Sequence, residues 1–139
     1  MKLSTKGRYG LRAMVDLAVH SADGPISINS IAKRQNISDG YLEQLIGKLK
    51  KAGLVDSVRG VCGGYRLAKP PSCISVGEVL MVLEGDLNPV DCAGFNEDKS
   101  CQNADTCTTK YVWKKINENI QDTVNHIYLS ELMDLKEKE

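Results

Sequence analysis

Apolar residues recur at helical spacing through the first fifty positions and predict three consecutive helices. Thr5 can cap a first helix that runs to about His20 and is apolar over much of its circumference, as is typical of a central helix. Ser27 can cap a short second helix and Ser38 a third. In the third helix the spacing i, i+3, i+4, i+7 predicts one buried stripe, made of Leu42, Leu45, Ile46 and Leu49. This order of helices predicts a helix-turn-helix.

The opposite face of the third predicted helix is small and polar. It carries Gly40, Tyr41, Gln44, Gly47, Lys48 and Lys51. A glycine inside an exposed helix costs about 1 kcal/mol relative to alanine, so two glycines on one face favour a surface that approaches a partner closely. Gln44 can pair with adenine, Lys48 can meet a phosphate, and Glu43 on the flank can accept a hydrogen bond from cytosine. The alternative is a solvated face that contacts nothing.

A glycine-rich turn joins two predicted strands, 54–58 and 64–68, and the pattern indicates a wing hairpin. Arg59 and Gly60 lie at the mouth of this turn. Arginine suits a narrow minor groove, where negative potential is concentrated, and glycine lets the backbone come close to a partner. Cys62 at the tip is interpreted as a small filler rather than a thiol switch.

Three further helices are predicted in the second half of the chain. Ser75 and Glu78 fit a capping box, and Gly85 is the expected stop of the helix that follows; Cys73 just before it is expected to be structural. A long helix over about 108–125 carries an apolar residue at every fourth position, namely Val112, Ile116, Ile120 and Val124.

This long helix would span roughly 27 Å, and a small winged domain offers it little surface. Pairing with a second copy would bury the apolar stripe, and symmetric DNA sites require a dimer. A short helix over 130–135 precedes a charged tail. The predicted fold is therefore mainly α with a small β-wing: a winged helix-turn-helix domain over 1–85, a cysteine-rich loop over 86–107, and a dimerisation helix with its C-terminal tail over 108–139.

The net charge of the chain is zero, but it is divided. Residues 1–70 carry twelve Lys and Arg against five Asp and Glu, whereas residues 71–139 carry six against thirteen. A basic half beside an acidic half favours nucleic acid as partner of the first half; the alternative is an ordinary solvated surface. No apolar run reaches the length of a signal peptide or the roughly 18 residues of a membrane span. We therefore expect a cytoplasmic protein without a membrane partner.

Three cysteines, Cys92, Cys101 and Cys107, lie in a polar stretch with no aliphatic residue beyond alanine. Such thiols are better placed to bind a metal than to pack, and disulfides are rare in the reducing cytoplasm. The spacing C-x8-C-x5-C contains no C-x2-C pair of the kind that zinc sites use. It favours an iron–sulfur cluster, with zinc or thiol redox chemistry as alternatives. A [2Fe–2S] cluster takes four ligands, so one position is left open.

Several motifs together resemble the iron–sulfur cluster regulators within a family of winged helix-turn-helix repressors. They are LSTKGRYGLRAM, YLEQL followed by RG-x-x-GGY, and three cysteines ahead of a long helix. The resemblance implies a homodimer on palindromic promoter DNA, with residues 41–44 in the major groove and the wing in the minor groove. It also implies a [2Fe–2S] cluster on the three cysteines, supplied by the cluster-assembly machinery, and repression of the genes for cluster assembly. The predicted DNA contacts are Lys6, Ser38, Tyr41, Glu43, Gln44, Lys48, Arg59 and Gly60.

The sequence departs from the pattern of these regulators in two ways. The first two cysteines are separated by eight residues instead of the commoner five, and Lys110 stands where a histidine is often found. The fourth ligand is therefore open among several groups: His20, His126, Asp91, Asp105 and an exogenous thiol. A branch that senses nitric oxide uses an acid near the N-terminus, where this chain has Arg8.

Three alternatives to a cluster-sensing regulator differ in how well the sequence supports them. A nitric-oxide or redox sensor of the same fold is the alternative within the family. An enzyme is not expected, because no histidine lies near the cysteines in sequence and no phosphate loop or paired-carboxylate motif occurs. A zinc-stabilised module that binds only proteins is a third class.

Overall fold

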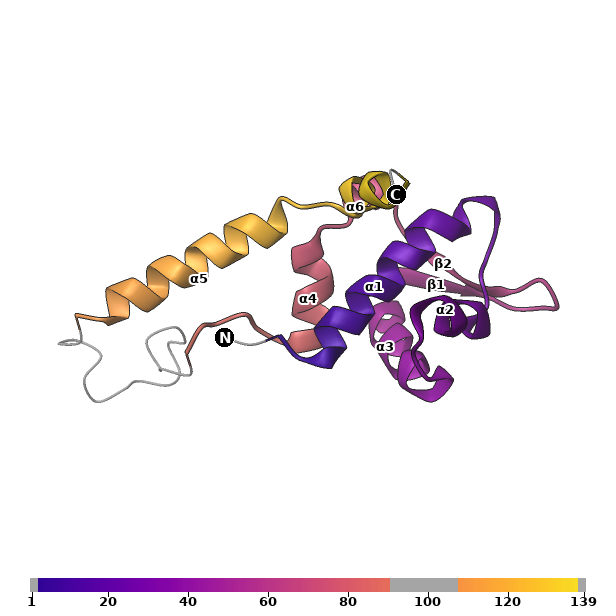
Figure 1. The fold of residues 1–139 in the computed structure, drawn as a ribbon, viewed down its shortest axis with the longest axis horizontal. Helices are drawn as coiled ribbons and strands as arrows, with labels where there is room; N and C mark the ends of the chain where they lie inside the picture. Colours follow the sequence, from indigo (N-terminus) through magenta and orange to yellow (C-terminus); the bar gives the residue numbers. More distant parts are fainter. Residues whose placement is uncertain (1–2, 91–107, 138–139) are drawn as a thin grey trace.

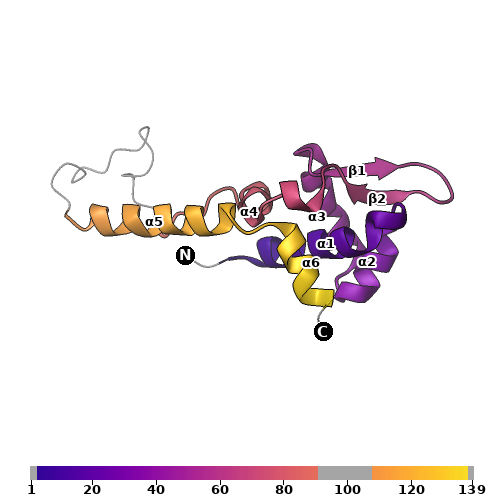
Figure 2. The same cartoon turned by 90° about the horizontal axis from the view of Figure 1, so that it is seen from above.

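The described part of the chain is mainly helical, with one two-stranded sheet. The computed structural model describes residues 3–90 and 108–137. The elements are α1 (Thr5–His20), η1 (Ser21–Asp23), α2 (Ile28–Gln35), α3 (Asp39–Lys51), β1 (Val55–Val58), β2 (Gly64–Leu67), η2 (Pro71–Cys73), α4 (Val76–Glu84), α5 (Lys110–Asn125) and α6 (Leu129–Glu137). Figure 1 shows α1 crossing the middle of the body, and both Figure 1 and Figure 2 show α5 projecting from it. The predicted mainly α fold with a small β-wing is confirmed.

The first helix is capped one residue earlier than predicted. Ser4 has an extended backbone, and its hydroxyl accepts a hydrogen bond from the Lys6 N–H at 3.2 Å. Thr5 already belongs to the helix, and its hydroxyl shares a 3.0 Å hydrogen bond with the Tyr41 hydroxyl. The prediction that Thr5 caps α1 was therefore wrong, because both neighbouring hydroxyls can cap a helix and a distant contact engages the second one.

The unit formed by α2, a tight turn and α3 has the predicted helix-turn-helix form. Ser27 caps α2 by accepting from the Ser30 N–H at 3.2 Å, and Ser38 caps α3 by accepting from the Tyr41 N–H at 3.3 Å. Between the two helices Asn36 adopts the left-handed conformation, with φ at 55°. Asparagine tolerates this conformation better than most residues, so α2 ends there and the chain can turn.

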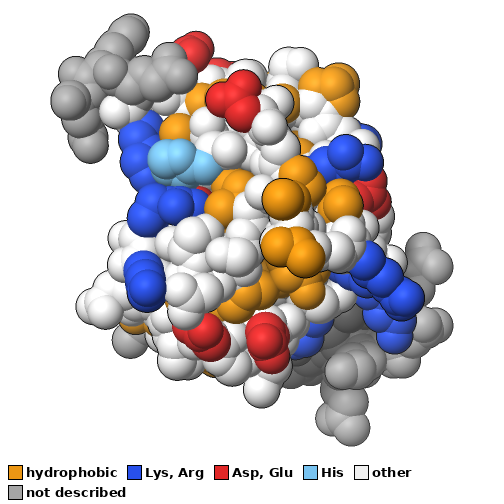
Figure 3. Space-filling view, turned by 90° about the vertical axis from the view of Figure 1, so that its right-hand side faces the viewer, with side chains coloured by type: hydrophobic (Ala, Val, Ile, Leu, Met, Phe, Trp, Pro, Cys, Tyr) orange, Lys and Arg blue, Asp and Glu red, His pale blue; other side chains and the backbone are white. Residues whose placement is uncertain are grey.

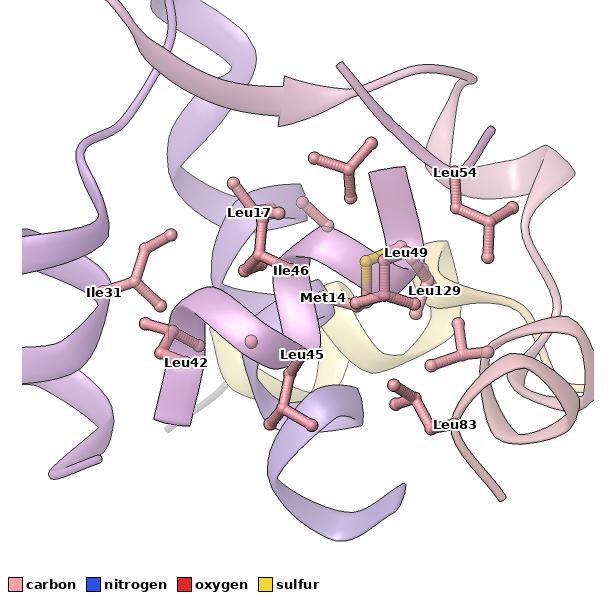
Figure 4. Packing of buried hydrophobic residues seen from close by; sticks show 14 of the residues in the cluster. Met14, Leu17, Ile31, Leu42, Leu45, Ile46, Leu49, Leu54, Leu83 and Leu129 are labelled. Atoms are coloured by element: carbon pink, nitrogen blue, oxygen red, sulfur yellow. The ribbon is translucent and has the colours of Figure 1, made fainter. Parts of the chain in front are cut away.

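One hydrophobic core joins the two ends of the chain. The predicted apolar stripe of α3 is at most 2% exposed. Side chains from four other helices gather around it in Figure 4, among them Met14, Leu17, Ile31, Leu83 and Leu129. Leu129 belongs to α6 and is fully buried, so the C-terminal helix shares a core with the helix-turn-helix. Full burial of one such side chain contributes about 1.5–3 kcal/mol.

The wing is an antiparallel hairpin whose strands are each one residue shorter than predicted. The Ala68 N–H still donates to the Leu54 carbonyl at 3.0 Å beyond the strand ends. At the other side of the hairpin, Ile26 and Tyr65 exchange two backbone hydrogen bonds of 2.8 and 2.7 Å. A Cβ at Gly64 would collide with the Ile26 backbone. The base of the wing is thereby fixed to the chain that leads into α2.

The fourth helix begins and ends as predicted, but the cysteine before it is not a packing residue. The Ser75 hydroxyl accepts from the Glu78 N–H at 3.1 Å, and the helix stops at Gly85, whose φ is 88°. Cys73 is exposed, because η2 runs over the surface after its proline. The expectation that Cys73 is structural was therefore wrong.

The long helix α5 begins two residues after its predicted start, and its apolar stripe is divided. Ile120 and Val124 pack against a small cluster of Val76, Leu80 and Leu87. Nearer the start of the helix, Val112 is 45% and Ile116 is 39% exposed, and none of the helix is fully buried. Among the described residues, only the second half of the stripe is packed against another part of the chain.

Within the two described stretches, none of the helices is both long enough and apolar enough to cross a membrane.

Candidate nucleic-acid interface

The polar face of α3 is turned to solvent. Glu43, Gln44 and Lys48 are exposed. Open space lies outside Gly40 and Gly47, where an added Cβ would meet no atom within 4 Å. Internal packing therefore does not require glycine at these positions, and each costs about 1 kcal/mol of helix propensity. Close approach by a partner provides a physical reason for both glycines.

Tyr41 differs from the rest of this face because it is half-buried and packs against the core. Its hydroxyl bonds to the Thr5 hydroxyl at 3.0 Å, and its ring meets Tyr9 edge-on with centroids 6.2 Å apart. The side chain thereby ties the start of α3 to the start of α1. Its contact with DNA stays a prediction, and its structural role was not indicated by the sequence pattern.

The hydrogen bond between Thr5 and Tyr41 holds the starts of α1 and α3 together. Two more of the predicted DNA-contacting residues, Lys6 and Ser38, lie at these helix starts. Lys6 is exposed in the first turn of α1, beside Thr5. Ser38 is exposed at the start of α3, and its hydroxyl oxygen accepts a hydrogen bond from the helix. A hydroxyl that accepts in this way keeps its proton to donate to a partner such as a phosphate.

The wing projects at the end of the molecule opposite α5 (Figure 1). Arg59 is exposed, and Gly60 has a φ of 117°, a region that favours glycine. Val61 at the tip is fully exposed and was not singled out from the sequence, although its place between Gly60 and Cys62 marks it as the centre of the turn. Cys62 is exposed too, and its interpretation as a small filler rather than a thiol switch stays a prediction.

Figure 3 looks onto this end of the molecule. Lys and Arg side chains lie mainly toward the two sides of the view, and hydrophobic side chains lie between them. A mixed surface of this kind can meet phosphates through its cations and still make apolar contacts.

An ion pair between the buried Asp16 and the partly exposed Arg34 fixes α2 on α1. Arg34 donates to both carboxylate oxygens of Asp16, at 2.9 and 2.7 Å, and the Gln35 amide donates at 2.9 Å. Burial alone would raise the pKa of Asp16, but these hydrogen bonds and the charge of Arg34 hold that pKa below its ordinary value. Sequence analysis missed this pair. The available signal was an acidic residue between Val15 and Leu17 in a central helix.

A second carboxylate closes the N-terminal end of α1. Glu84 Oε1 accepts hydrogen bonds from the Ser4 N–H at 2.9 Å, the Ser4 hydroxyl at 2.7 Å and the Gly7 N–H at 3.0 Å. Burial alone would raise the pKa of Glu84, but these hydrogen bonds hold it below its ordinary value. The end of α4 thus supplies an acceptor that the first turn of a helix lacks and a negative charge at the positive end of its dipole.

The three predicted cluster ligands, Cys92, Cys101 and Cys107, lie outside the described residues. Among the residues that are described, no group of three or more His, Cys, Asp or Glu side chains is gathered to hold a metal ion. The two cysteines with a described position, Cys62 and Cys73, are exposed and unpaired.

The positions of the two histidines bear on the fourth ligand. His126 follows α5 directly, whereas Cys107 precedes it by three positions. A 16-residue helix spans about 24 Å, so His126 lies far from the start of α5 within one protomer. The ring of His126 also lies 2.6 Å from the Asp122 carbonyl oxygen. His20 is the last residue of α1, and the C-terminal end of that helix lies on the far side of the molecule from the start of α5 (Figures 1 and 2).

A family model described as Rrf2, an iron-dependent transcriptional regulator, matches residues 3–135. The chain belongs to the Rrf2 family. It is 44% identical over 133 residues to the HTH-type transcriptional regulator IscR of Yersinia enterocolitica, with 96% of this chain and 79% of that relative covered. The HTH-type transcriptional regulator IscR of Pectobacterium atrosepticum is 44% identical over 137 residues, covering 99% of this chain and 82% of the relative.

Solved structures extend the match to nearly every element of this Rrf2 chain. CymR (YrzC), the global cysteine regulator of B. subtilis, has a TM-score of 0.80 and 39% identity, over 97% of this chain and 98% of its own. IscR of T. potens has a TM-score of 0.77 and 43% identity, over 100% of this chain and 89% of its own. The predicted winged helix fold, the resemblance to cluster regulators and the assignment as a transcriptional regulator are confirmed.

Proposed function

We propose that this Rrf2 regulator is a homodimeric repressor of iron–sulfur cluster biogenesis genes. It senses cluster supply through a [2Fe–2S] cluster on Cys92, Cys101 and Cys107. The observation that carries the proposal is the C-x8-C-x5-C set of thiols in a chain 44% identical to IscR of Yersinia enterocolitica. When clusters are scarce the regulator loses its own, repression is lifted, and more assembly machinery is made.

Double-stranded promoter DNA is the partner that fits α3 and the wing. The exposed Gln44 and Lys48 supply base and phosphate contacts in a major groove. Arg59 on the projecting wing supplies a positive charge for the adjacent minor groove. Lys6 and Ser38, at the neighbouring starts of α1 and α3, supply phosphate contacts that set the register of the protein on the duplex.

A second copy of the chain is the partner that fits α5. Tyr111, Val112 and Ile116 are 67%, 45% and 39% exposed, and all three lie within the first two turns of the helix. Two such helices side by side would remove these side chains from water, at about 25 cal/mol per Å² of apolar surface. Twofold symmetry would then place two copies of α3 on the half-sites of a palindromic promoter.

The donor chemistry of the three cysteines fits an iron–sulfur cluster. Iron in such clusters takes thiolate ligands, and the sequence contains no C-x2-C pair. When bound, the cluster supplies a centre that responds to iron, sulfide and oxidants. Asp91, Asp105 or an exogenous thiol is favoured as the fourth ligand, because both histidines lie far from the start of α5 within one protomer. The cluster-assembly machinery is the donor.

Glu43 is the residue that we expect to discriminate between two classes of promoter. Its carboxylate is exposed on the flank of α3 and can accept a hydrogen bond from a cytosine amino group. Against an acceptor base edge the same carboxylate is desolvated without a partner, which costs free energy. A change in the pose of α3 on cluster binding would impose or remove that cost.

Chemical analysis of anaerobically purified protein tests the cluster. We expect visible-region absorption, with about two iron and two acid-labile sulfide per chain. Cys92→Ala should abolish the colour and leave a folded dimer, whereas Cys73→Ala, a matched change at an exposed thiol, should alter neither. A colourless protein that holds zinc after attempted reconstitution would contradict the proposal. About four of each per chain would favour the alternative, a nitric-oxide or redox sensor.

A further inference from the structure

The first turn of α1 is held from two sides. On one side Glu84 Oε1 accepts from the Ser4 N–H at 2.9 Å and from the Gly7 N–H at 3.0 Å. On the other side the Thr5 hydroxyl shares a 3.0 Å hydrogen bond with the hydroxyl of Tyr41 in α3. Ser4 and Thr5 are consecutive residues. The residue bound by the end of α4 is therefore joined covalently to the residue that contacts the recognition helix.

The end of α4 is packed closely on α1 at this junction. Gly7 and Gly10 are buried on α1. A Cβ at Gly7 would lie 2.5 Å from Glu84 Oε1, and a Cβ at Gly10 would collide with Leu83. Glycine at both positions lets the end of α4 lie directly on the α1 backbone. Close-packed interiors have low compressibility and transmit strain, so a shift of α4 is passed to α1.

The end of α4 leads toward the proposed cluster ligands over a short and anchored segment. Glu84 lies eight positions before Cys92. Within that interval Leu87 is only 2% exposed and packs between α4 and α5. A pull on Cys92, or the loss of that pull, would therefore act on a segment that Leu87 fixes close to Glu84.

We propose that Glu84 and Thr5 are positioning residues that couple the occupancy of the cluster site to the pose of α3. The proposal rests on the proposed function above. With the cluster bound, the segment before Cys92 is held, Glu84 holds the first turn of α1, and Thr5 holds Tyr41. Without the cluster this constraint on α3 is released. The strength of the coupling is measured by the ratio of the DNA affinities of cluster-loaded and cluster-free protein.

DNA dissociation constants of cluster-free and cluster-loaded protein measure that ratio directly. We expect about a 5–150-fold difference for wild type on a promoter fragment. Glu84→Ala and Thr5→Val, which break the link at its two ends, should each bring the ratio close to one without changing iron and sulfide content. Glu84→Gln keeps an acceptor oxygen and should fall between wild type and Glu84→Ala.

A control on the same helix separates this link from a general effect of α4 charge. Glu78→Ala removes the α4 carboxylate that pairs with Lys69 at 3.1 Å, and it should keep the wild-type ratio. Hydrogen exchange supplies a readout without DNA. The Gly7 amide, which donates to Glu84, should exchange more slowly in loaded than in cluster-free wild type, and equally in both states of Glu84→Ala.

Two negative results have different meanings. Equal weakening of both states by the link variants, with the wild-type ratio kept, would show that these contacts are only structural and would overturn the coupling alone. Wild-type protein that takes up no cluster, or that binds DNA equally in both states, would overturn the proposed function together with the coupling. If Glu84→Ala does not fold, Thr5→Val decides, because it removes one exposed hydrogen bond.

Discussion

The helices α3 and α5 are both amphipathic, but they bury their apolar faces in different ways. The apolar stripe of α3 is at most 2% exposed, whereas α5 has no buried residue and leaves Ile116 39% exposed. Figure 1 shows α3 packed within the body and α5 projecting from it, with only its C-terminal part near α4.

The difference shows which face of each helix is left for a partner. In α3 the apolar face is buried by the rest of the chain. The polar face with Gln44 and Lys48 is therefore the one that remains for a polar partner such as DNA. In α5 the polar face needs no partner, and exposed Tyr111, Val112 and Ile116 remain for an apolar one. One chain thus presents two surfaces of opposite chemistry, as a DNA-binding dimer requires.

The largest effect is expected where the α3 stripe meets the core. Leu49→Ala should lower the free energy of unfolding by about 3–4 kcal/mol, because truncation of a fully buried leucine leaves a cavity. Urea denaturation measures the loss. Leu135→Ala, at a leucine that is 62% exposed in α6, should change the unfolding free energy by less than about 0.5 kcal/mol. Equal losses of unfolding free energy in Leu49→Ala and Leu135→Ala would contradict the burial of the α3 stripe in the core.

The ion pair that fixes α2 on α1 should have the next largest effect. Arg34→Met should lower the free energy of unfolding at pH 7 by about 2–3 kcal/mol, because it leaves the buried Asp16 carboxylate without its cation. Arg34 is itself 34% exposed, so the expected loss lies at or below the lower end of the roughly 3–5 kcal/mol that breaking a buried pair costs.

Acidification sharpens this test. The pKa of Asp16 is lower in the folded than in the unfolded state, so the pair stabilises the fold at neutral pH. That contribution is lost as the pH falls through the folded-state pKa. The difference between Arg34→Met and wild type, measured by urea titration at several pH values, should therefore shrink below the ordinary pKa of aspartate. A difference independent of pH would contradict the role of charge.

On α5 the expected effect concerns association rather than folding. Ile116→Lys should weaken self-association by about 2 kcal/mol, because dimer formation would then bury an unpaired ammonium group, while circular dichroism stays unchanged. Glu118→Gln changes the net charge by the same amount at an exposed polar position and should leave self-association unchanged. Sedimentation equilibrium measures both. Equal behaviour of the two variants would mean that the apolar face of α5 is not the interface.

The smallest expected effect concerns the wing. Arg59→Ala should weaken binding to a footprinted promoter fragment by about 1–2 kcal/mol if the wing enters a groove. Lys115→Ala removes a cation from α5 instead and should have little effect. Fluorescence anisotropy at fixed ionic strength compares the two variants, since phosphate contacts depend strongly on salt. Unchanged affinity in Arg59→Ala would remove the wing from the interface.

The helix-turn-helix could be predicted from the sequence because its signals are local. The apolar stripe of α3 follows from spacing alone, and Ser27 and Ser38 cap the helices that they precede. The predicted cap of α1 was one residue too late because Ser4 and Thr5 are both good caps. The choice between them involves Glu84, which is 80 positions away in sequence.

Contacts between distant segments account for the rest of what was missed. The pairing of Asp16 with Arg34 and the bond of Tyr41 to Thr5 join separate helices, and no periodicity reports them. The stripe of α5 appeared uniform in sequence, yet α4 covers only its C-terminal half. Periodicity shows that a face is apolar, but only the tertiary arrangement decides whether the chain or a partner covers it.

The central claim is that a cluster on the cysteine segment governs DNA binding by α3 and the wing. The most direct test compares cluster-loaded and cluster-free protein from one preparation on promoter fragments recovered from its own genome. We expect affinities that differ by about fivefold or more and a footprint with two half-sites related by twofold symmetry. Equal affinities of the two states would contradict the claim.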